Sequence, residues 1–517
     1  MPQLNFLIIM ADQMAGPAAP FNGHTVTRLP NLQSLAQDAV IFDSAYCASP
    51  LCAPSRAALM TGQLCSKTGA YDNAAEFTSS IPTFGHYLRD LGYYTCLCGK
   101  MHFVGPDQLH GFEERLTTDI YPADFGWTPD WERPEHRPSW YHNMLSVVQA
   151  GTCLTSNQLD FDEEVTFQAI RKLHDLARGS DGRPFCFFVS FTHPHDPYAI
   201  PQEYWDRYDH DAIDLPAVAP IPLDQLDPHS QRVHHVCDLG RYRQTQERVR
   251  TARHAYYAMI SYVDDKVGQI VRTLAATGLD ENTIVVFTSD HGDMLGERGL
   301  WYKMVFFEWA VRVPLFFHAP GRFAPRHVAS HVSLLDLLPT LVELASGRPD
   351  LASADGLDGQ SLVPLLHGTH AGGSRAVPCE ILCEGAIAPC FMIRHGRFKY
   401  ICSEPDPDQL YDLEADPHEL RNLAGQPGYE QLQTDFRAQV SEHWDARAIH
   451  RAVLQSQRRR KLAASALSKG RRGWSTSGWD YQPFVAVSEQ YMRGHLNLDD
   501  LERRARFPAP EIPEPGT

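Results

Sequence analysis

The sequence lacks any apolar run long enough to cross a membrane, and it has no excess of positive charge. A membrane-spanning helix needs about 20 mostly apolar residues. The 63 acidic side chains outnumber the 46 lysines and arginines, and the resulting net charge of -17 argues against a nucleic-acid partner. The apolar residues 4–10 follow no basic region and precede no cleavage site, so we interpret them as a core strand instead of a signal peptide.

Paired cysteine spacings are also missing. The 12 cysteines are scattered along the chain, and Cys96 and Cys98, which alternate along an expected strand, make only a weak metal pair. This usage is typical of a reduced protein, and we expect a cytoplasmic one. The sequence has no internal repeats, and its 43% hydrophobic and 21% charged content describes a globular chain.

The distribution of apolar runs predicts the fold class. Runs of strand length alternate with helical patterns at residues 162–177, 247–277 and 333–345, which indicates an α/β fold with a large mixed, mainly parallel sheet between helices. Because 517 residues are too many for one core, we expect a catalytic domain over residues 1–375 and a smaller α+β subdomain over 376–469. We expect a four-stranded antiparallel sheet in the subdomain, with a hairpin turning at His395 and Gly396.

The end of the chain has two distinctive segments. Residues 429–467 are helical in pattern and increasingly basic, and we interpret the run from Arg458 to Lys461 as a solvated helix face. Residues 470–517 form an aromatic tail that is too irregular for a core of its own. We expect the tail to dock on the parent domain or on a neighbouring subunit.

The most informative segment begins at Cys52. It reads Cys-Ala-Pro-Ser-Arg and runs on to Gly62. Proline suits the first turn of a helix and glycine follows its last, so the segment predicts a short helix with Cys52 at its mouth. The free amides and the dipole at that end favour an anion. Cys52 is therefore either a small packing residue or a nucleophile beside an anion site.

Four of the expected strands end in polar side chains. In open α/β sheets ligands bind beyond the carboxyl ends of the strands, so these ends can converge on one site. The residues are Asp12 and Gln13; Lys100 and His102; His193, His195 and Asp196; and Asp290, His291 and Asp293.

A subset of these residues predicts a metal site. Asp12, Gln13, Asp290 and His291 offer two carboxylates, an amide oxygen and an imidazole. Mostly oxygen ligands favour Ca²⁺, Mn²⁺ or Mg²⁺ over Zn²⁺, and we expect Ca²⁺. Asp293 is expected to orient the loop without touching the metal.

Over its whole length the sequence resembles the sulfatases of the alkaline phosphatase superfamily. The resemblance rests on the signature Cys-x-Pro-Ser-Arg at residues 52–56 and on residues 71–76, 99–102, 110–127, 192–197 and 290–303. Gln13 and His291 stand where many sulfatases carry Asp and Asn, and residues 479–483 and 490–493 are similar to the C-terminal extension of choline sulfatases.

The resemblance implies a mechanism for sulfate ester hydrolysis. A formylglycine-generating enzyme would oxidise Cys52, and the formylglycine hydrate, itself a metal ligand, would attack sulfur. Arg56, Lys100 and Lys303 would hold the hydrate and the sulfuryl oxygens. His195, in preference to His193, would protonate the leaving alcohol, and His102 would assist the release of sulfate.

The same resemblance implies choline sulfate as the substrate. A quaternary ammonium donates no hydrogen bonds, so aromatic faces and a carboxylate must hold it. The resemblance places Trp127, His142 and Glu384 in this pocket, and Asn73 would donate a hydrogen bond to the sulfate.

Nearby candidates receive different expectations. We expect Trp131, Trp140 and Tyr302 to be ordinary packing residues. We expect a tail carboxylate such as Asp499 to reach a neighbouring subunit's pocket. The tail also predicts a homodimer or homotetramer. We expect no membrane partner.

Three alternatives compete with this function. A phosphonate monoester or phosphodiester hydrolase shares the nucleophile, Gln13 and His291, and an arylsulfatase of the same superfamily is the second. In a non-catalytic alternative, Cys52 stays a thiol and the fold only binds an anion or a partner.

Overall fold

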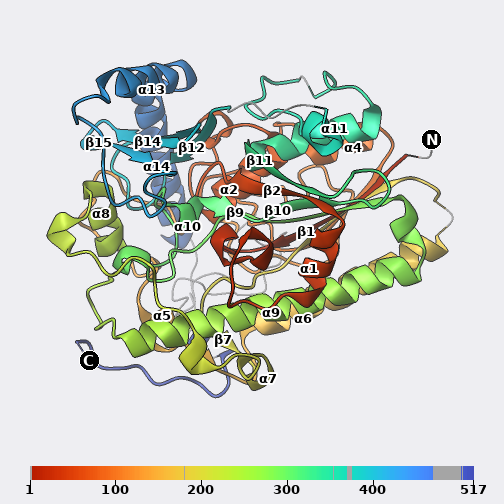
Figure 1. Ribbon diagram of the computed structural model, residues 1–517, viewed down its shortest axis with the longest axis horizontal. Helices are drawn as coiled ribbons and strands as arrows, with labels where there is room; N and C mark the ends of the chain where they lie inside the picture. The colour runs from red at the N-terminus through yellow and green to blue at the C-terminus, as the bar shows by residue number, and fades with distance from the viewer. Residues whose placement is uncertain are drawn as a thin grey trace.

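The structure is a computed structural model that describes residues 3–179, 181–352, 354–369, 375–469, 502–503 and 505–516. Within these ranges, nine strands form a central sheet in the order β11-β2-β10-β8-β1-β6-β3-β4, with β9 paired to β2 (Figure 1). Only β9 and β10 run antiparallel to their neighbours, so the predicted mainly parallel sheet is confirmed. The strands are β1 (Asn5–Ala11), β2 (Ala39–Tyr46), β3 (Tyr94–Gly99), β4 (Glu114–Arg115), β6 (Phe185–Ser190), β8 (Thr283–Ser289), β9 (Arg312–Val313), β10 (Leu315–His318) and β11 (Arg326–Ser333).

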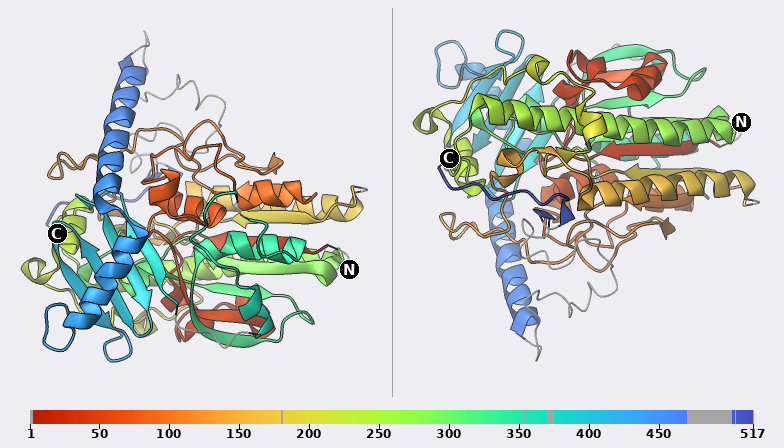
Figure 2. Two further views of the ribbon diagram at one scale, coloured as in Figure 1. Left: turned by 90° about the horizontal axis from the view of Figure 1, so that it is seen from above. Right: turned by 90° about the horizontal axis from the view of Figure 1, so that it is seen from below.

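Helices cover both faces of this sheet (Figures 1 and 2). The long α6 and α9 run beside each other with α1 on one face, and α2, α4 and α11 pack together on the other. These helices are α1 (Pro30–Gln37), α2 (Cys52–Thr61), α4 (Phe84–Asp90), α6 (Asn157–Arg178), α9 (Gln246–Ala276) and α11 (Leu337–Ser346). Shorter helices in the connections are α3 (Cys65–Thr68), α5 (Leu145–Val148), α7 (Gln202–Trp205), α8 (Pro228–Val236), α10 (Glu308–Val311) and α12 (Val363–His367).

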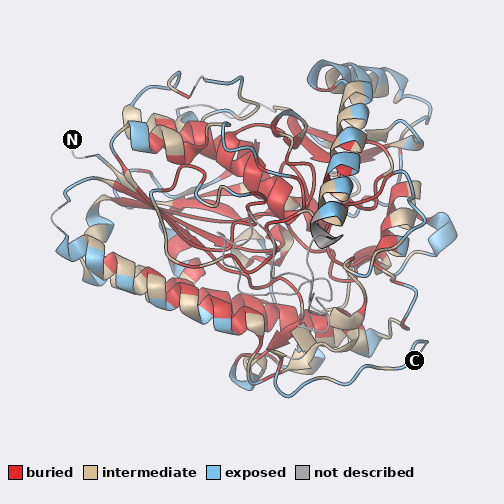
Figure 3. Ribbon diagram, turned by 180° about the vertical axis from the view of Figure 1, so that it is seen from behind, coloured by how far each residue is buried: buried red, intermediate tan, exposed pale blue. Residues whose placement is uncertain are grey.

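The central strands are buried along nearly their whole length (Figure 3). The strands of a parallel sheet that is covered on both faces are continuous apolar runs in the sequence. The sequence therefore predicts β1, β6 and β8 as strands.

The order of the strands brings the four predicted polar ends together. β8, β1, β6 and β3 are consecutive and parallel. Their last residues are in register, with Ala11 beside Ser289 and Gly99 beside Ser190. Because these ends lie at one edge of the sheet, the side chains that follow them converge there.

A separate antiparallel sheet of four strands follows, as expected. It consists of β12 (Val377–Ile381), β13 (Cys390–His395), β14 (Phe398–Ser403) and β15 (Asp406–Asp412), and β13 and β14 are the predicted hairpin. A further pair, β5 (Gly151–Thr152) and β7 (Ala199–Ile200), joins two connections.

The predicted helical segment near the C-terminus is two helices, α13 (Glu430–His443) and α14 (Ala446–Lys469). The interpretation of its basic run as a solvated face is wrong for Arg460, which is buried and forms a two-point ion pair with Asp72. Lys461 also pairs with Asp130, and Arg458 with Glu132. Acidic groups from distant loops therefore balance most of this run.

The final described segment docks on connections of the larger, N-terminal part of the chain. Phe507 exchanges backbone hydrogen bonds with Leu154 and Thr155, and Gly516 donates to the carbonyl of Arg241. Most of the predicted aromatic tail, including Asp499, lies outside the described residues. No helix among those that are described has the length and apolarity needed to span a membrane.

Candidate active site

Cys52 lies at the first turn of α2, at the carboxyl edge of the central sheet. The helix ends before Gly62, whose φ of 65° is left-handed, as the sequence predicts. All residues of α2 are buried, and Cys52 is 1% exposed. Burial, and then the Asp12 carboxylate, raise the pKa of the Cys52 thiol to about 11. The unmodified thiol is protonated at neutral pH and is a poor nucleophile.

Cys52 belongs to a compact group of potential metal ligands. Its Sγ lies 3.2 Å from Nε2 of His291, and ligand atoms of Asp12, Cys52, Asp290 and His291 all lie within 4.8 Å of one another. Burial lowers the pKa of His291 to about 4, so the ring is neutral. Its Nδ1 lies 3.0 Å from the carbonyl oxygen of Gly292, which leaves the Nε2 lone pair for a metal. Two carboxylates and one imidazole fit a single divalent ion.

Arg56 connects the two carboxylates of this group. Its Nη2 lies 2.7 Å from Asp12 and its Nε 2.8 Å from Asp290, and all three groups are fully buried. Its Nη1 donates to the Lys100 carbonyl and to Ser190 Oγ. These contacts let Arg56 position the two carboxylates, and its expected role in holding the hydrate and the sulfuryl oxygens stays a prediction.

Lys100 approaches the same group from the end of β3. Its Nζ pairs with Asp12 and lies 3.7 Å from Cys52 Sγ. Burial opposes ionisation of Asp12, but Lys100 and Arg56 hold its pKa well below the usual range. Gly99 makes this placement possible, because a Cβ at its φ of 104° would lie 1.9 Å from the carbonyl oxygen of Ser190.

Gln13 has a strained, left-handed backbone with a φ of 64°. Its side-chain oxygen accepts a hydrogen bond from Lys303, and its Nε2 donates to Asp293 at 2.6 Å. Its role as a metal ligand stays a prediction, because the amide oxygen is bonded to Lys303 here. Asp293 also accepts from the backbone of Leu295 and Tyr302, so it orients the loop as expected.

Lys303 and His195 form a buried proton-carrying pair. Lys303 Nζ lies 3.0 Å from His195 Nε2, and His195 Nδ1 lies 2.7 Å from the Asp196 carbonyl oxygen. Burial and the Lys303 charge hold the pKa of His195 well below its ordinary value. His193 is bonded instead to Asp162 at 2.7 Å, which is consistent with the choice of His195 over His193.

A pocket of about 50 Å³ opens beside Cys52. It is lined by all four predicted substrate-binding residues, Asn73, Trp127, His142 and Glu384, and by His102 and His195. Burial and then Lys100 lower the pKa of His102 to about 3, and neither ring nitrogen has a hydrogen-bond partner among the described residues.

Glu384 is the buried carboxylate of this pocket. Burial raises its pKa to about 7, and its Oε2 accepts no hydrogen bond within the described structure. His142 lies 3.6 Å from Asp196 and stacks on Tyr302. Cys52, with Lys100 Nζ 3.7 Å from its sulfur, and the Glu384 carboxylate therefore line one cavity.

Several lining residues were missed or misjudged from the sequence. Trp140 packs against the core, as expected, and it also lines the pocket, where it stacks on Trp127 with ring centroids 6.2 Å apart. Trp131 and Tyr302 do not line the pocket, as expected. Tyr121 and Glu502 were not singled out, and only the resemblance of residues 110–127 gave a signal for Tyr121.

The fold and the site define an α/β protein in which potential ligands for one divalent metal ion lie beside a buried cysteine at the carboxyl edge of the sheet. Comparison with known proteins specifies it further. The sulfatase family profile matches residues 4–347, and the chain belongs to the sulfatase family and is a sulfuric ester hydrolase. Two C-terminal profiles also match, that of the choline sulfatase enzyme at residues 451–507 and that of N-sulphoglucosamine sulphohydrolase at 296–446.

Individual relatives agree with this assignment. A choline-sulfatase from Rhizobium meliloti (strain 1021) is 50% identical over 98% of this chain and 99% of its own. Arylsulfatase K from Homo sapiens is 28% identical over 81% of this chain and 78% of its own. Among solved structures, the phosphonate monoester hydrolase of Agrobacterium radiobacter superposes with a TM-score of 0.66 and 26% identity, covering 87% of this chain and 96% of that one.

Proposed function

We propose that this chain hydrolyses choline sulfate to choline and sulfate. The observation that carries the proposal is the buried Glu384 carboxylate in the same pocket as Cys52. A carboxylate in the same pocket as the stacked rings of Trp127 and Trp140 matches a quaternary ammonium, which needs aromatic faces and a negative charge. The 50% identical relative is named choline-sulfatase, which supports the same substrate.

The protein groups at the other end of the pocket suit the sulfate. Lys100 and Lys303 bring two buried positive charges toward Cys52, and His102 and Asn73 line the wall beside it. Such fixed charges stabilise negative charge that develops on the sulfuryl oxygens and on the leaving alcohol. A proton for the departing alkoxide is available at the hydrogen bond between Lys303 Nζ and His195 Nε2.

We assign the nucleophile to formylglycine formed from Cys52 and the metal to Ca²⁺, with Mn²⁺ or Mg²⁺ as alternatives. Asp12, Asp290 and His291, with Gln13 and residue 52, would hold the metal, which would acidify the attacking hydroxyl when bound. Arg56 would keep both carboxylates in place. The raised pKa of the Cys52 thiol supports an oxygen nucleophile over a thiolate.

The remaining features of the proposal concern the whole chain. We place the catalytic domain at residues 1–375, the α+β subdomain at 376–469 and the tail at 470–517. The tail would join subunits into a homodimer or homotetramer. A cytoplasmic formylglycine-generating enzyme would be the maturation partner.

The deciding experiment compares substrates on enzyme whose state at residue 52 has been measured by peptide mass spectrometry. We expect choline sulfate to have a higher kcat/KM than both an aryl phosphonate monoester and an aryl sulfate. A preference for the phosphonate would favour the hydrolase activity of the Agrobacterium structural neighbour, and a preference for the aryl sulfate would remove choline from the proposal. An entirely unmodified thiol in active protein would exclude the formylglycine nucleophile.

A further inference from the structure

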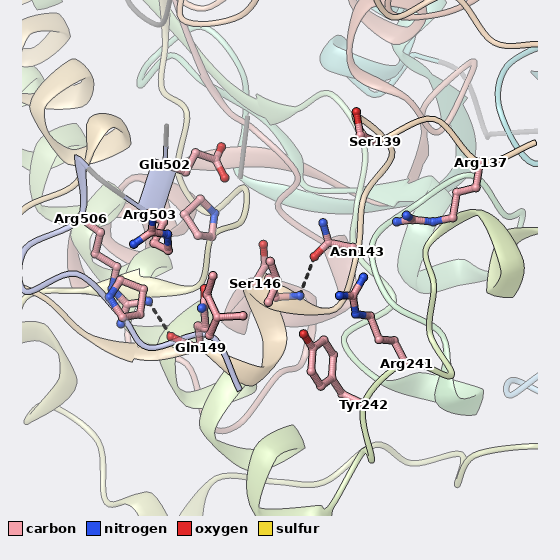
Figure 4. A pocket seen from close by; sticks show the side chains of 14 residues that line it. Arg137, Ser139, Asn143, Ser146, Gln149, Arg241, Tyr242, Glu502, Arg503 and Arg506 are labelled. Carbon is pink, nitrogen blue, oxygen red and sulfur yellow. Dashed lines mark hydrogen bonds between the residues drawn. The ribbon is translucent and has the colours of Figure 1, made fainter. Parts of the chain in front are cut away.

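A second cavity, of about 380 Å³, adjoins the active-site pocket. The two cavities share Ser139, Asn143, Ser146 and Glu502 in their linings. Figure 4 shows Asn143 and Ser146 between Arg137 and Arg241 on one side and Arg503 and Arg506 on the other. Anything that leaves the small inner pocket by this side passes four guanidinium groups.

The described lining of the outer cavity carries more positive than negative charge. Four of its described residues are arginines and one is a carboxylate, that of Glu502, whose Oε1 accepts from Gln158 at 3.0 Å. Arg137 donates to the carbonyl oxygens of Val236 and His142, which carry no formal charge. Arg241 is exposed and reaches Asp238 only at 3.5 Å.

Arg506 gives an independent sign that an anion belongs here. It is 8% exposed, and it donates to the carbonyl oxygens of Gln149 and Thr152. Its Nε has no hydrogen-bond partner in the described parts of the chain. Both acceptors that this guanidinium contacts are carbonyl oxygens and not carboxylates. Burying its positive charge therefore costs free energy unless an anion comes near it. Burial lowers the pKa of Arg506 for the same reason.

The chemistry of the lining selects the ligand. Guanidinium groups present planar pairs of N–H donors that match tetrahedral oxyanions. A free sulfate dianion is attracted by such groups, whereas the quaternary ammonium of a zwitterionic ester is repelled by them. Inorganic sulfate, the product that a sulfatase releases, is therefore the favoured occupant.

We propose that the cavity lined by Arg137, Arg241, Arg503 and Arg506 is a second anion site, which takes up inorganic sulfate as it leaves the active-site pocket. Sulfate as the product follows from the sulfatase family, and the preference for free sulfate over the ester rests on the proposed function. It predicts that each chain binds two sulfate ions, one in the inner pocket and one in the outer cavity.

The test is isothermal titration of holoenzyme with sodium sulfate. Wild type should bind two sulfates per chain, and Arg241→Gln/Arg503→Gln should keep one while the other weakens by at least about tenfold, as expected for lost charge-assisted hydrogen bonds. Arg243→Gln is the matched control, because Arg243 is exposed on the same loop and lines neither cavity. It should retain both sites and full activity.

Two results would overturn the proposal: a single sulfate per wild-type chain, or two equally tight sulfates in both wild type and the double variant. If the double variant does not fold, Arg241→Gln alone is titrated, and unchanged binding of both sulfates counts against the site. Titration of Cys52→Ala with choline sulfate should give one bound molecule. Two would show that the outer cavity holds the ester instead of free sulfate.

Discussion

Burial raises the pKa of both Cys52 and Glu384, and the two shifts affect the reaction differently. For Cys52, a pKa of about 11 removes the thiolate from the chemistry near neutral pH. For Glu384, a pKa of about 7 places the change of charge in the physiological range. The Cys52 thiol is therefore a poor nucleophile until it is converted into another group. The Glu384 carboxyl can be neutral in the empty pocket and ionised when a cation is bound.

Substitution of Cys52 tests the nucleophile. Cys52→Ala should abolish turnover of choline sulfate, because no other residue at the site carries a suitable nucleophile in the proposed mechanism. The fold should remain, since the change removes a single sulfur atom from a buried helix. Steady-state kinetics with circular dichroism as the folding control measures this, and residual turnover above background would mean that another group attacks.

Glu384 gives a pH-dependent prediction. It is protonated below about pH 7 and ionised above it. KM for choline sulfate should therefore fall as pH rises from 6 to 8, because the ionised carboxylate attracts the ammonium. Glu384→Gln should raise KM and flatten this profile, while KM for an aryl sulfate, whose aryl group carries no positive charge, should not change. An unchanged KM for choline sulfate would remove Glu384 from the pocket.

The same residue affects stability with the opposite trend. The pKa of Glu384 is higher in the folded chain than the ordinary 4.5, so the folded state binds more protons between pH 4.5 and about 7. The free energy of unfolding should fall as pH rises through that window. Glu384→Gln should reduce this slope in denaturant titrations at several pH values, and an unaltered slope would show that the carboxyl is not shifted.

At the scale of elements, the strands were predictable and the position of α14 was not. The apolar runs of β1, β3, β6 and β8 end in polar residues, and parallel packing alone brings those ends together. The ion pair of Arg460 joins residues 388 positions apart, and the charge of a helix does not reveal such a distant partner. The place of Trp140 in the pocket lining was missed for a similar reason, since its sequence neighbourhood indicates packing and gives no sign of the cavity.

α14 supports the substrate pocket through Arg460. The partner, Asp72, precedes Asn73, whose side chain lines the pocket and accepts from the backbone of Ala53. Arg460→Met should lower the free energy of unfolding by about 3–5 kcal/mol, because it leaves a buried carboxylate unpaired. KM should rise as Asn73 loses its support.

The exposed neighbour Arg459 supplies the control for this experiment. Arg459→Met makes the same substitution on the same helix at an exposed position. It should leave both the unfolding curve and KM unchanged. Equal effects of the two variants would show that the helix as a whole, and not the Arg460–Asp72 pair, matters.

At the scale of the whole molecule, the C-terminal segment completes the active site. Glu502, close to the end of the chain, lines the same pocket as Cys52, which lies close to its beginning. Removal of residues 470–517 should raise KM for choline sulfate and should shift the chain to a smaller oligomer. Kinetics and size-exclusion chromatography with light scattering measure the two effects, and an unchanged oligomer would place the subunit contacts elsewhere.

Metal removal tests the ligand group as a unit. Chelation should abolish activity and lower the melting temperature, because a ligand that binds only the folded state stabilises it. The chain should still fold, since Arg56 and Lys100 neutralise Asp12 and Asp290 within the protein. Ca²⁺ should restore both properties more fully than Mg²⁺ or Mn²⁺. A melting temperature that is insensitive to chelator and metal would argue against a bound ion.

The complete burial of α2 has a consequence for how the chain matures. Once folded, the protein encloses Cys52 so fully that no modifying enzyme can reach it. The proposed oxidation must therefore take place on the nascent or unfolded chain, in competition with folding itself. Chains that fold first are locked in the thiol form, so the active fraction of a preparation is set by the relative rates of synthesis, folding and modification in the cell that makes it.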